Sequence, residues 1–354
     1  MILTDLRTWL TVALALLQSG CGALYVAQAA RGQWQVMSVR RPIEQVLADP
    51  NSTVELRARL ERVRLARQFA VSQLGLPDNK SYTTYADIGR DYVVWNVVAT
   101  PEFAVGPLEW CFPVAGCVAY RGYFAERRAR EFAARLKREG NDVLVQGVPA
   151  YSTLGRFADP VLNTMLSYGD DELTGMVFHE LAHQVVYLPG DTAFNEAFAV
   201  TVEQEGLARW VPDEGRADFS PRCRQRLVLR ARVVAVVARY RDLLDDLYQQ
   251  AAPDDRKRER KAKLFIELAN EVAALQQAAG VTSPFADELA RDPNNAWLAS
   301  LATYYECVPG FQRLLVEEQH DLSRFFVRVR ELTMPDAAAR RVALCEGSGA
   351  HSGG

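Results

Sequence analysis

Apolar residues recur at helical spacing over most of the chain. Between Thr53 and Leu74 they fall every three or four residues and arginines occupy the other face, which predicts a long amphipathic helix with a solvated basic side. Beyond Trp210 the same spacing predicts almost uninterrupted helix. The helices expected there cover residues 222–250, 256–279, 294–306, 322–332 and 337–344.

β-branched and aromatic residues gather in the region 81–123 and just beyond it. They predict a strand at 92–99 and a strand or turn at 120–124. A charged helix at 125–139 and a further strand at 142–148 follow. The sequence therefore predicts a mainly helical α+β fold that contains a small sheet.

The stretch Gly169–Arg209 predicts two helices joined by a tight break. The acidic residues 170–172 favour a helix start, because negative charge complements the positive end of the helix dipole. Apolar residues then continue at helical spacing until Leu188–Gly190 ends the helix. Asp191 or Thr192 can cap the second helix. Because the break is short, we expect the two helices to lie antiparallel.

The first of these helices carries an H-E-x-x-H motif, with His179 and His183 one turn apart on the same face. That spacing lets both imidazoles bind one zinc ion, with Glu180 beside them as a candidate general base. Glu196 lies as far beyond the turn as His183 lies before it, so an antiparallel pair places these two residues level. Glu203 lies two turns further, roughly 10 Å along the axis at ~1.5 Å per residue. We therefore predict Glu196 as the third ligand, and Glu203 as a residue that orients a ligand or replaces one.

A short motif of this kind also occurs by chance, and the alternative is an ordinary amphipathic helix with two polar histidines on its surface. Three features favour a metal site. The helix is apolar around both histidines, a glutamate falls at the level that the geometry requires, and two of the chain's four histidines belong to the motif.

Such a site predicts hydrolysis of a peptide bond. Zinc would hold a water molecule in its open fourth position, while Glu180 would take the water's proton and later pass it to the leaving amine. Candidates to stabilise the oxyanion are Tyr151, Tyr168 and Tyr187. Each of these tyrosines could instead be a packed aromatic with its hydroxyl at the surface.

Composition and charge narrow the class of protein. The 354 residues are 49% hydrophobic and 24% charged, as in a globular protein with a sizeable core. The formal net charge is −3, from 41 basic and 44 acidic residues, so the whole chain gives no electrostatic reason to expect nucleic acid as a partner.

Residues 1–20 are typical of a targeting segment. Its apolar core, Trp9–Leu17, is too short to span a bilayer as a helix, and it ends at Gln18-Ser19-Gly20-Cys21. This ending is similar to a bacterial lipobox, in which the cysteine is lipidated and becomes the new N terminus. An ordinary secretory signal and a short buried helix are the alternatives. We expect export to the bacterial cell envelope, with a lipid on Cys21 that anchors the protein to a membrane facing the periplasm, the outer membrane being the expected one.

Export has a consequence for the six cysteines. Cys111 and Cys117 are expected to form a disulfide across a small loop, because exported proteins meet an oxidising environment. Metal binding by this pair is less favoured, since no histidine lies nearby. Of Cys223, Cys307 and Cys345, any two could pair.

The metal motif and its surroundings resemble a known family. HELAHQ, followed by a short loop and FNEAFA, is similar to the gluzincin branch of zinc metallopeptidases, and more closely to a family of bacterial lipoproteins described as predicted aminopeptidases. The resemblance covers nearly the whole mature chain, including Cys21 and residues 33–42, 110–117 and 120–124. It implies that the protein removes residues from peptide N termini.

The resemblance also implies how a substrate is held. In zincins the strand before the metal helix commonly binds the peptide as an added strand, which suggests this role for the extended segment 150–157. An aminopeptidase also needs an acidic recess for the substrate's free amine, for which Glu203, Glu205 or Asp159 could serve.

These patterns combine into a zincin-like region in which a small sheet packs on the metal helix, followed by a helical subdomain. The expected segments are a signal peptide at 1–20, an N-terminal helical segment at 21–80, the metal-binding region at 81–211, the helical subdomain at 212–346 and a disordered tail at 347–354. The predicted function is a zinc peptidase. The alternative is a lipid-anchored scaffold or binding protein whose zinc site is structural or vestigial.

Overall fold

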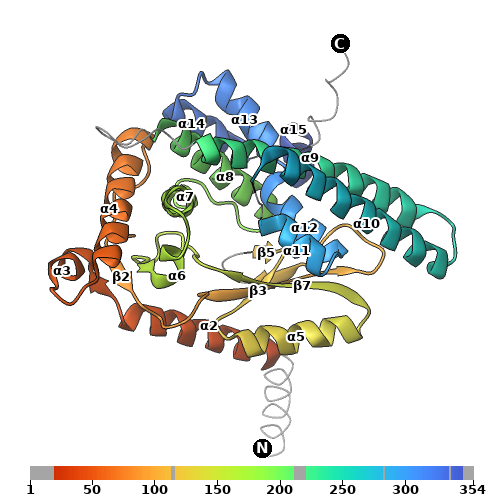
Figure 1. The fold of residues 1–354 in the computed structure, drawn as a ribbon, viewed down its shortest axis with the longest axis horizontal. Coiled ribbons are helices and arrows are strands. Elements are labelled where there is room, and N and C mark those ends of the chain that lie inside the picture. The colour runs from red at the N-terminus through yellow and green to blue at the C-terminus, as the bar shows by residue number, and fades with distance from the viewer. Residues whose placement is uncertain (1–19, 113–115, 211–220, 282–283, 335, 346–354) are drawn as a thin grey trace, which may run out of the picture.

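The computed structural model describes residues 20–112, 116–210, 221–281, 284–334 and 336–345. Helices dominate the molecule, and the strands form two three-stranded sheets and one hairpin (Figure 1). The helices are α2 (Gly20–Ser38), α3 (Ile43–Ala48), α4 (Val54–Leu74), α5 (Glu126–Arg138), α6 (Asn163–Leu166), α7 (Asp170–Ala182), α8 (Thr192–Arg209), α9 (Pro221–Gln249), α10 (Asp254–Ala279), α11 (Pro284–Arg291), α12 (Asn295–Tyr305), α13 (Val308–Glu317), α14 (Leu322–Glu331) and α15 (Ala337–Leu344). The strands are β1 (Arg41–Pro42), β2 (Thr84–Ala86), β3 (Val94–Pro101), β4 (Trp110–Phe112), β5 (Gly116–Val118), β6 (Arg121–Tyr123), β7 (Asn141–Val148) and β8 (Val161–Leu162).

The larger sheet separates helices on its two faces. Its order is β6-β3-β7, with both pairs antiparallel, and β7 follows β3 along the whole of Val94–Pro101. Phe132 of α5 belongs to the apolar cluster on one face. Ala296 and Ala299 of α12 pack with Val98 on the other face. Figure 1 shows α2 and α5 below this sheet, and α7, α8 and α12 above it.

The two smaller β elements connect distant parts of the chain. β1 pairs antiparallel with β2, which pairs parallel with β8. β4 and β5 form a hairpin in which Cys111 lies opposite Cys117, and the predicted disulfide joins them. Gly116 has φ +75°, and a Cβ there would lie 2.3 Å from the backbone nitrogen of Gly190. Only glycine therefore allows this hairpin to approach the turn between α7 and α8 so closely.

The basic face of α4 is solvated only in part, at Arg64, so the sequence prediction of a solvated face is wrong for the arginines that contact α7. Arg59 and Arg62 both form ion pairs with Asp170 at the start of α7, and their side chains are only 14% and 18% exposed. Arg59 also donates a hydrogen bond to the carbonyl oxygen of Tyr168. An amphipathic pattern shows that a helix face is polar, but not whether that face meets water or the acidic start of another helix. Here the two arginines anchor the start of α7.

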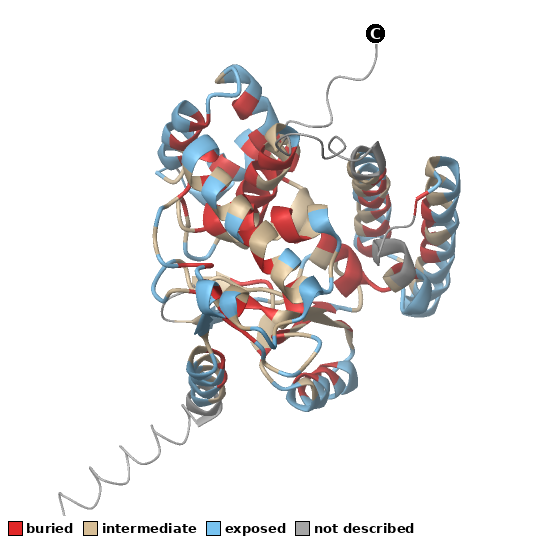
Figure 2. Ribbon diagram, turned by 60° about the vertical axis from the view of Figure 1, so that its left-hand side comes forward, coloured by how far each residue is buried: buried red, intermediate tan, exposed pale blue. Residues whose placement is uncertain are grey.

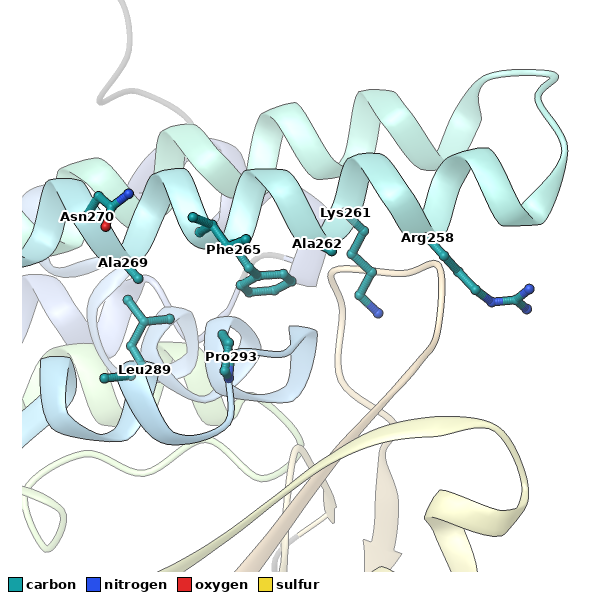
Figure 3. Close-up of a pocket in the computed structure, with 10 residues that line it drawn as sticks. Arg258, Lys261, Ala262, Phe265, Ala269, Asn270, Leu289 and Pro293 are labelled. Atoms are coloured by element: carbon teal, nitrogen blue, oxygen red, sulfur yellow. The ribbon is translucent and has the colours of Figure 1, made fainter.

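α9 and α10 form a long antiparallel hairpin that extends away from the sheet (Figures 1 and 2). Its apolar seam continues into α12 through Trp297 and Leu298. A groove of about 470 Å³ runs between α10 and α11, with Phe265 and Leu289 among its lining residues (Figure 3). Lys261, also in this lining, pairs with Asp142 of β7 at 2.6 Å.

The last three helices pack on α8. Phe198 of α8 stacks against Phe325 of α14, with ring centroids 6.0 Å apart. A disulfide joins Cys307, just before α13, to Cys345, just after α15. This pairing is one of those that the sequence left open, and the third candidate, Cys223, lies in α9 with its side chain outside the described residues.

One apolar core unites the regions that the sequence separated. It includes Leu60 of the N-terminal segment, Phe178 of the metal-binding region and Phe311 of the C-terminal helices. The predicted signal peptide, apart from Gly20, and the predicted tail lie outside the described residues. Among the helices that are described, none is both long and apolar enough to cross a membrane.

Two local predictions before and within the metal hairpin are wrong. Segment 150–157 is not a strand; it forms a loop in which Leu154 and Gly155 have φ of +58° and +73°, so its backbone cannot continue a ladder. α7 ends at Ala182 rather than near Leu188. The next residues form tighter i→i−3 bonds, from the N–H of Gln184 to Leu181 at 3.1 Å and from that of Val185 to Ala182 at 2.9 Å.

Because aromatic side chains of α8, α13 and α14 pack together, truncating one of them should greatly lower the stability of the protein. Phe325→Ala should lower the free energy of unfolding by about 3–5 kcal/mol, because Phe325 is fully buried against Phe198 and Phe311. Val327→Ala on the same helix, where the side chain is 53% exposed, should change it by less than about 0.5 kcal/mol. Urea unfolding followed by circular dichroism measures both, and equal midpoints for the two variants would contradict this packing.

Candidate metal centre

The end of α7 presents both histidines of the motif to the same side. His179 lies in the last turn, and His183 is the capping residue that follows it. The backbone of His183 remains helical, with φ −57° and ψ −18°, and its N–H still bonds to the carbonyl oxygen of His179 at 3.3 Å. The i, i+4 relation is therefore preserved although α7 is shorter than predicted, and the two rings lie 4.9 Å apart.

The turn into α8 is closed by side chains rather than by packing alone. The Asn195 amide donates to the carbonyl oxygen of Leu188 at 2.8 Å and accepts from the Leu188 N–H at 2.7 Å. Asp191 caps α8 by accepting from the N–H of Phe194 at 3.0 Å. Arg340 of α15 holds this cap through a 2.8 Å ion pair with Asp191. These contacts fix the first turn of α8 and, with it, the position of the next residue, Glu196.

Glu196 faces both histidines. Its Oε2 lies 3.3 Å from Nε2 of His179 and 3.6 Å from Nε2 of His183. One donor atom from each of the three residues lies within 4.8 Å of the others. Bonds of about 2.0–2.1 Å in a tetrahedral zinc site place neighbouring donor atoms ~3.4 Å apart. The two separations from the Glu196 oxygen, 3.3 and 3.6 Å, are close to that value, so these residues could hold a zinc ion.

Glu203 supports the site from behind His179. Its Oε2 lies 3.2 Å from Nδ1 of His179, on the far side of the ring from the donor nitrogen. Arg230 of α9 lies 3.9 Å from the other carboxylate oxygen of Glu203. Nδ1 of His183, in contrast, is buried and has no hydrogen-bond partner in the described part of the chain. Glu203 therefore fixes the orientation and tautomer of one histidine, as carboxylates beside metal ligands commonly do.

Without a metal ion, His179 and Glu196 form an ion pair. Burial tends to lower the pKa of His179, but its hydrogen bonds to Glu196 and Glu203 outweigh burial and raise the pKa well above its usual value. Burial tends to raise the pKa of Glu196, but the charge of His183 and hydrogen bonds from both histidines hold it at about 2. Because a metal binds neutral imidazole, binding displaces the proton on His179 and strengthens as the pH rises.

Glu180 lies next to these donors but does not belong to the group of three. Burial raises the pKa of its carboxyl group, and the neighbouring His179 and His183 partly offset that rise. The carboxylates of Glu196 and Asp159 raise the pKa further. A buried carboxylate with a raised pKa is suited to accept and return a proton near neutral pH.

The three tyrosines named from the sequence lie in different surroundings. Tyr187, in the turn after α7, is close enough to Glu196 for its charge to raise the tyrosine pKa, in addition to burial. The Tyr151 hydroxyl bonds instead to Gln33 of α2. Tyr168 is influenced by burial and by Tyr92, Glu288 and Glu172, which are not metal donors. Only the first of the three is thus placed beside the donor set.

Two further tyrosines, which the sequence did not indicate, lie close enough to the site for the charge of Glu196 to affect their pKa. The charge of Glu196, followed by burial, raises the pKa of Tyr304 in α12 well above its usual value. Burial and then Glu196 do the same for Tyr120, which lies between β5 and β6. Neither hydroxyl has a hydrogen-bond partner among the described residues. Both tyrosines lie far from the motif along the chain, and no spacing rule connects them to it.

Because Glu203 contacts His179, substituting Glu203 should lower the metal affinity while all three donor residues remain in place. Glu203→Gln should weaken zinc binding about 10–100-fold, because an amide orients the imidazole less strongly than a carboxylate does. Glu205→Gln is the matched control on α8, since Glu205 contacts Arg209 and His320 instead. Competition with a chromogenic chelator measures the affinity, and equal affinities for the two variants would contradict this role.

Comparison with known proteins identifies a family that covers most of the chain. A family model with the description "Putative aminopeptidase" matches residues 24–344, from α2 to the end of α15. Neither a curated protein nor a solved structure matches the chain. The matched region contains the three candidate donors, Glu180 and the Cys111–Cys117 disulfide. The chain therefore belongs to this putative aminopeptidase family.

Proposed function

We propose that the protein is a zinc-dependent peptidase that removes residues from the N terminus of peptides. The observation that carries the proposal is the donor set: Nε2 of His179, Nε2 of His183 and a carboxylate oxygen of Glu196 converge between α7 and α8. Two imidazoles and one carboxylate are typical of catalytic zinc sites, which keep a fourth position open. Membership of the aminopeptidase family supports peptides as the substrate.

In this proposal zinc supplies Lewis acidity, which lowers the pKa of a water molecule and polarises the scissile carbonyl group. Glu180 accepts the proton of the attacking water and passes it to the nitrogen of the leaving amine. Its burial beside two histidines suits both steps, since the raised pKa of the carboxyl group makes it a better base than an exposed glutamate and still lets it return the proton.

Tyr304 and Tyr120 are the better candidates to stabilise the oxyanion. Their hydroxyls lie in the electrostatic field of Glu196 and Glu180, and neither bonds to another described residue, so each can donate to a substrate oxygen. Tyr187 is a third candidate. Tyr151 and Tyr168 are less suited, because their hydroxyls interact with residues outside the donor set.

The proposed mechanism predicts that activity and metal binding separate in one variant. Glu180→Gln should still bind one zinc ion per chain. Its kcat for a peptide with a free N terminus should fall about 10²–10⁴-fold, because the amide cannot accept the water's proton. Glu172→Gln, in the first turn of the same helix, is the control and should keep both. Metal analysis and a peptide-release assay measure the two properties. Full turnover by Glu180→Gln would contradict the mechanism, and zinc-loaded wild-type protein that cleaves no peptide would favour the scaffold hypothesis.

We propose further that the protein is exported and anchored to the bacterial envelope by a lipid on Cys21. The apolar segment Trp9–Leu17 and the following Gln18–Cys21 support this proposal. α2 includes Cys21 and exposes two apolar side chains, Trp34 at 70% and Val26 at 53%, which suit the edge of a bilayer.

The anchor predicts a defined mass and location. Protein expressed in a bacterium should sediment with membranes, and its intact mass should match a chain that begins at Cys21 and carries fatty acyl groups. Cys21→Ser should remove the lipid and release the protein into the soluble fraction. An unmodified Cys21 in membrane-bound protein would exclude this anchor.

A further inference from the structure

Two loops that are distant in the chain meet at the end of the metal helix. Gln184, the residue after His183, accepts a hydrogen bond from the Asn79 amide at 2.6 Å and donates one to the Ser81 hydroxyl at 3.3 Å. From the other side, a Cβ on Gly155 would lie 3.2 Å from the Gln184 amide oxygen. The two loops, residues 79–82 and 151–159, therefore lie against the same end of α7, next to His183.

A buried carboxylate lies where these loops meet. Asp159 is 3% exposed, and its carboxylate accepts from the N–H of Thr153 at 2.9 Å and from the Thr153 hydroxyl at 2.8 Å. Burial raises the pKa of Asp159, which these hydrogen bonds and the charge of Arg40 only partly offset. Arg40 itself donates to the carbonyl oxygen of Ala158 at 3.0 Å rather than to the carboxylate. Asp159 thus lacks a direct cationic partner among the described residues.

Tyr82 adds a second, independent polar group to this place. Its N–H bonds to the carbonyl oxygen of Asp159 at 2.7 Å, which links the two loops. The side chain is 2% exposed, and its hydroxyl is buried without a hydrogen-bond partner. Glu180, Asp159 and Tyr151 are the groups whose electrostatic influence reaches that hydroxyl. A buried polar atom without a partner is uncommon in folded proteins, and one beside a proposed catalytic glutamate suggests a missing ligand.

The backbone of Tyr82 supports this reading. Its φ is +60°, in the left-handed region that residues with a side chain rarely adopt. Such a conformation persists only where surrounding contacts determine it, and these conformations cluster at ligand sites. Here it turns a large phenol into the interior, where the charges of Glu180 and Asp159 reach the hydroxyl, at a position where glycine or asparagine would adopt this φ more easily.

We propose that Asp159 and Tyr82 form the subsite that binds the protonated α-amine of the substrate, next to Glu180. This proposal rests on the proposed peptidase function and names the substrate class, peptides with a free N terminus. An ammonium group brings three N–H donors and one positive charge, which match the carboxylate of Asp159 and the unpartnered hydroxyl of Tyr82. An acylated N terminus supplies neither the charge nor the donors, so it would leave both groups unsatisfied in the complex.

The test compares one peptide with a free N terminus and the same peptide N-acetylated. Wild-type protein should cleave the free peptide with a kcat/KM at least 100-fold higher. Asp159→Asn should lower that ratio at least tenfold, mainly by raising KM for the free peptide. Asparagine has the shape of aspartate and keeps an acceptor for Thr153, so the loop should remain folded. Tyr82→Phe, which removes only the hydroxyl, should lower the ratio by a smaller factor.

Glu288→Gln is the matched control. Glu288 is also a carboxylate whose pKa is raised by burial, but it lies beside Gln146, outside the metal site. This variant should keep the wild-type ratio. If Asp159→Asn kept it too, or if it lowered both rates equally together with the thermal midpoint, Asp159 would be a structural residue and the subsite would be excluded.

A binding measurement separates this proposal from the peptidase proposal. Leucinol carries a free α-amine but no amide bond that the protein could hydrolyse, and calorimetry can follow its binding to the zinc-loaded protein. We expect Asp159→Asn to weaken this binding at least tenfold, and N-acetyl-leucinol to bind to neither protein. A wild-type protein that binds leucinol through Asp159 but cleaves no peptide would overturn the peptidase function alone. Equal binding of leucinol and its acetylated form would overturn the subsite alone.

Discussion

The turn between α7 and α8 is the constraint on which the site depends. Three donor atoms can share one ion only if two antiparallel helices are held at a fixed level, and the Asn195 amide sets that level by bonding to both backbone groups of Leu188. Asp191 and Arg340 then fix the helix start that carries Glu196. A small shift along either axis would change the donor separations by more than a zinc site tolerates.

The burial of several carboxylates opposes this arrangement. Burying Glu180, Glu196 and Glu203 together costs solvation free energy, which the chain offsets with two histidines and with Arg230 beside Glu203. His179 therefore holds a proton when only protein groups are present, and a metal ion would have to replace that proton. The same groups that make the fold compatible with buried carboxylates also make metal binding depend on pH.

Parts of the chain far from the motif complete the site. α4 anchors the start of α7 through Arg59 and Arg62, the disulfide hairpin lies against the turn before α8, and α15 reaches the cap of α8. Close approach of helices is possible because Gly206 of α8 faces Phe178 and Leu74, where a Cβ would lie only 2.6 Å from the phenyl ring. The two disulfides hold the outer members of this assembly, the hairpin and α15.

The sequence by itself determined the long helices and the predicted donor set, because helical periodicity and an i, i+4 spacing are local properties that survive folding. It also indicated that Glu196 lies level with His183, since a short turn leaves little freedom. Only the tertiary structure decided that Arg59 and Arg62 face α7, that the charge of Glu196 reaches Tyr304 and Tyr120, and that Tyr82 is buried and bonds to the backbone of Asp159. Those relations join residues that are distant in the chain, and packing between whole elements fixes them, which no local pattern records.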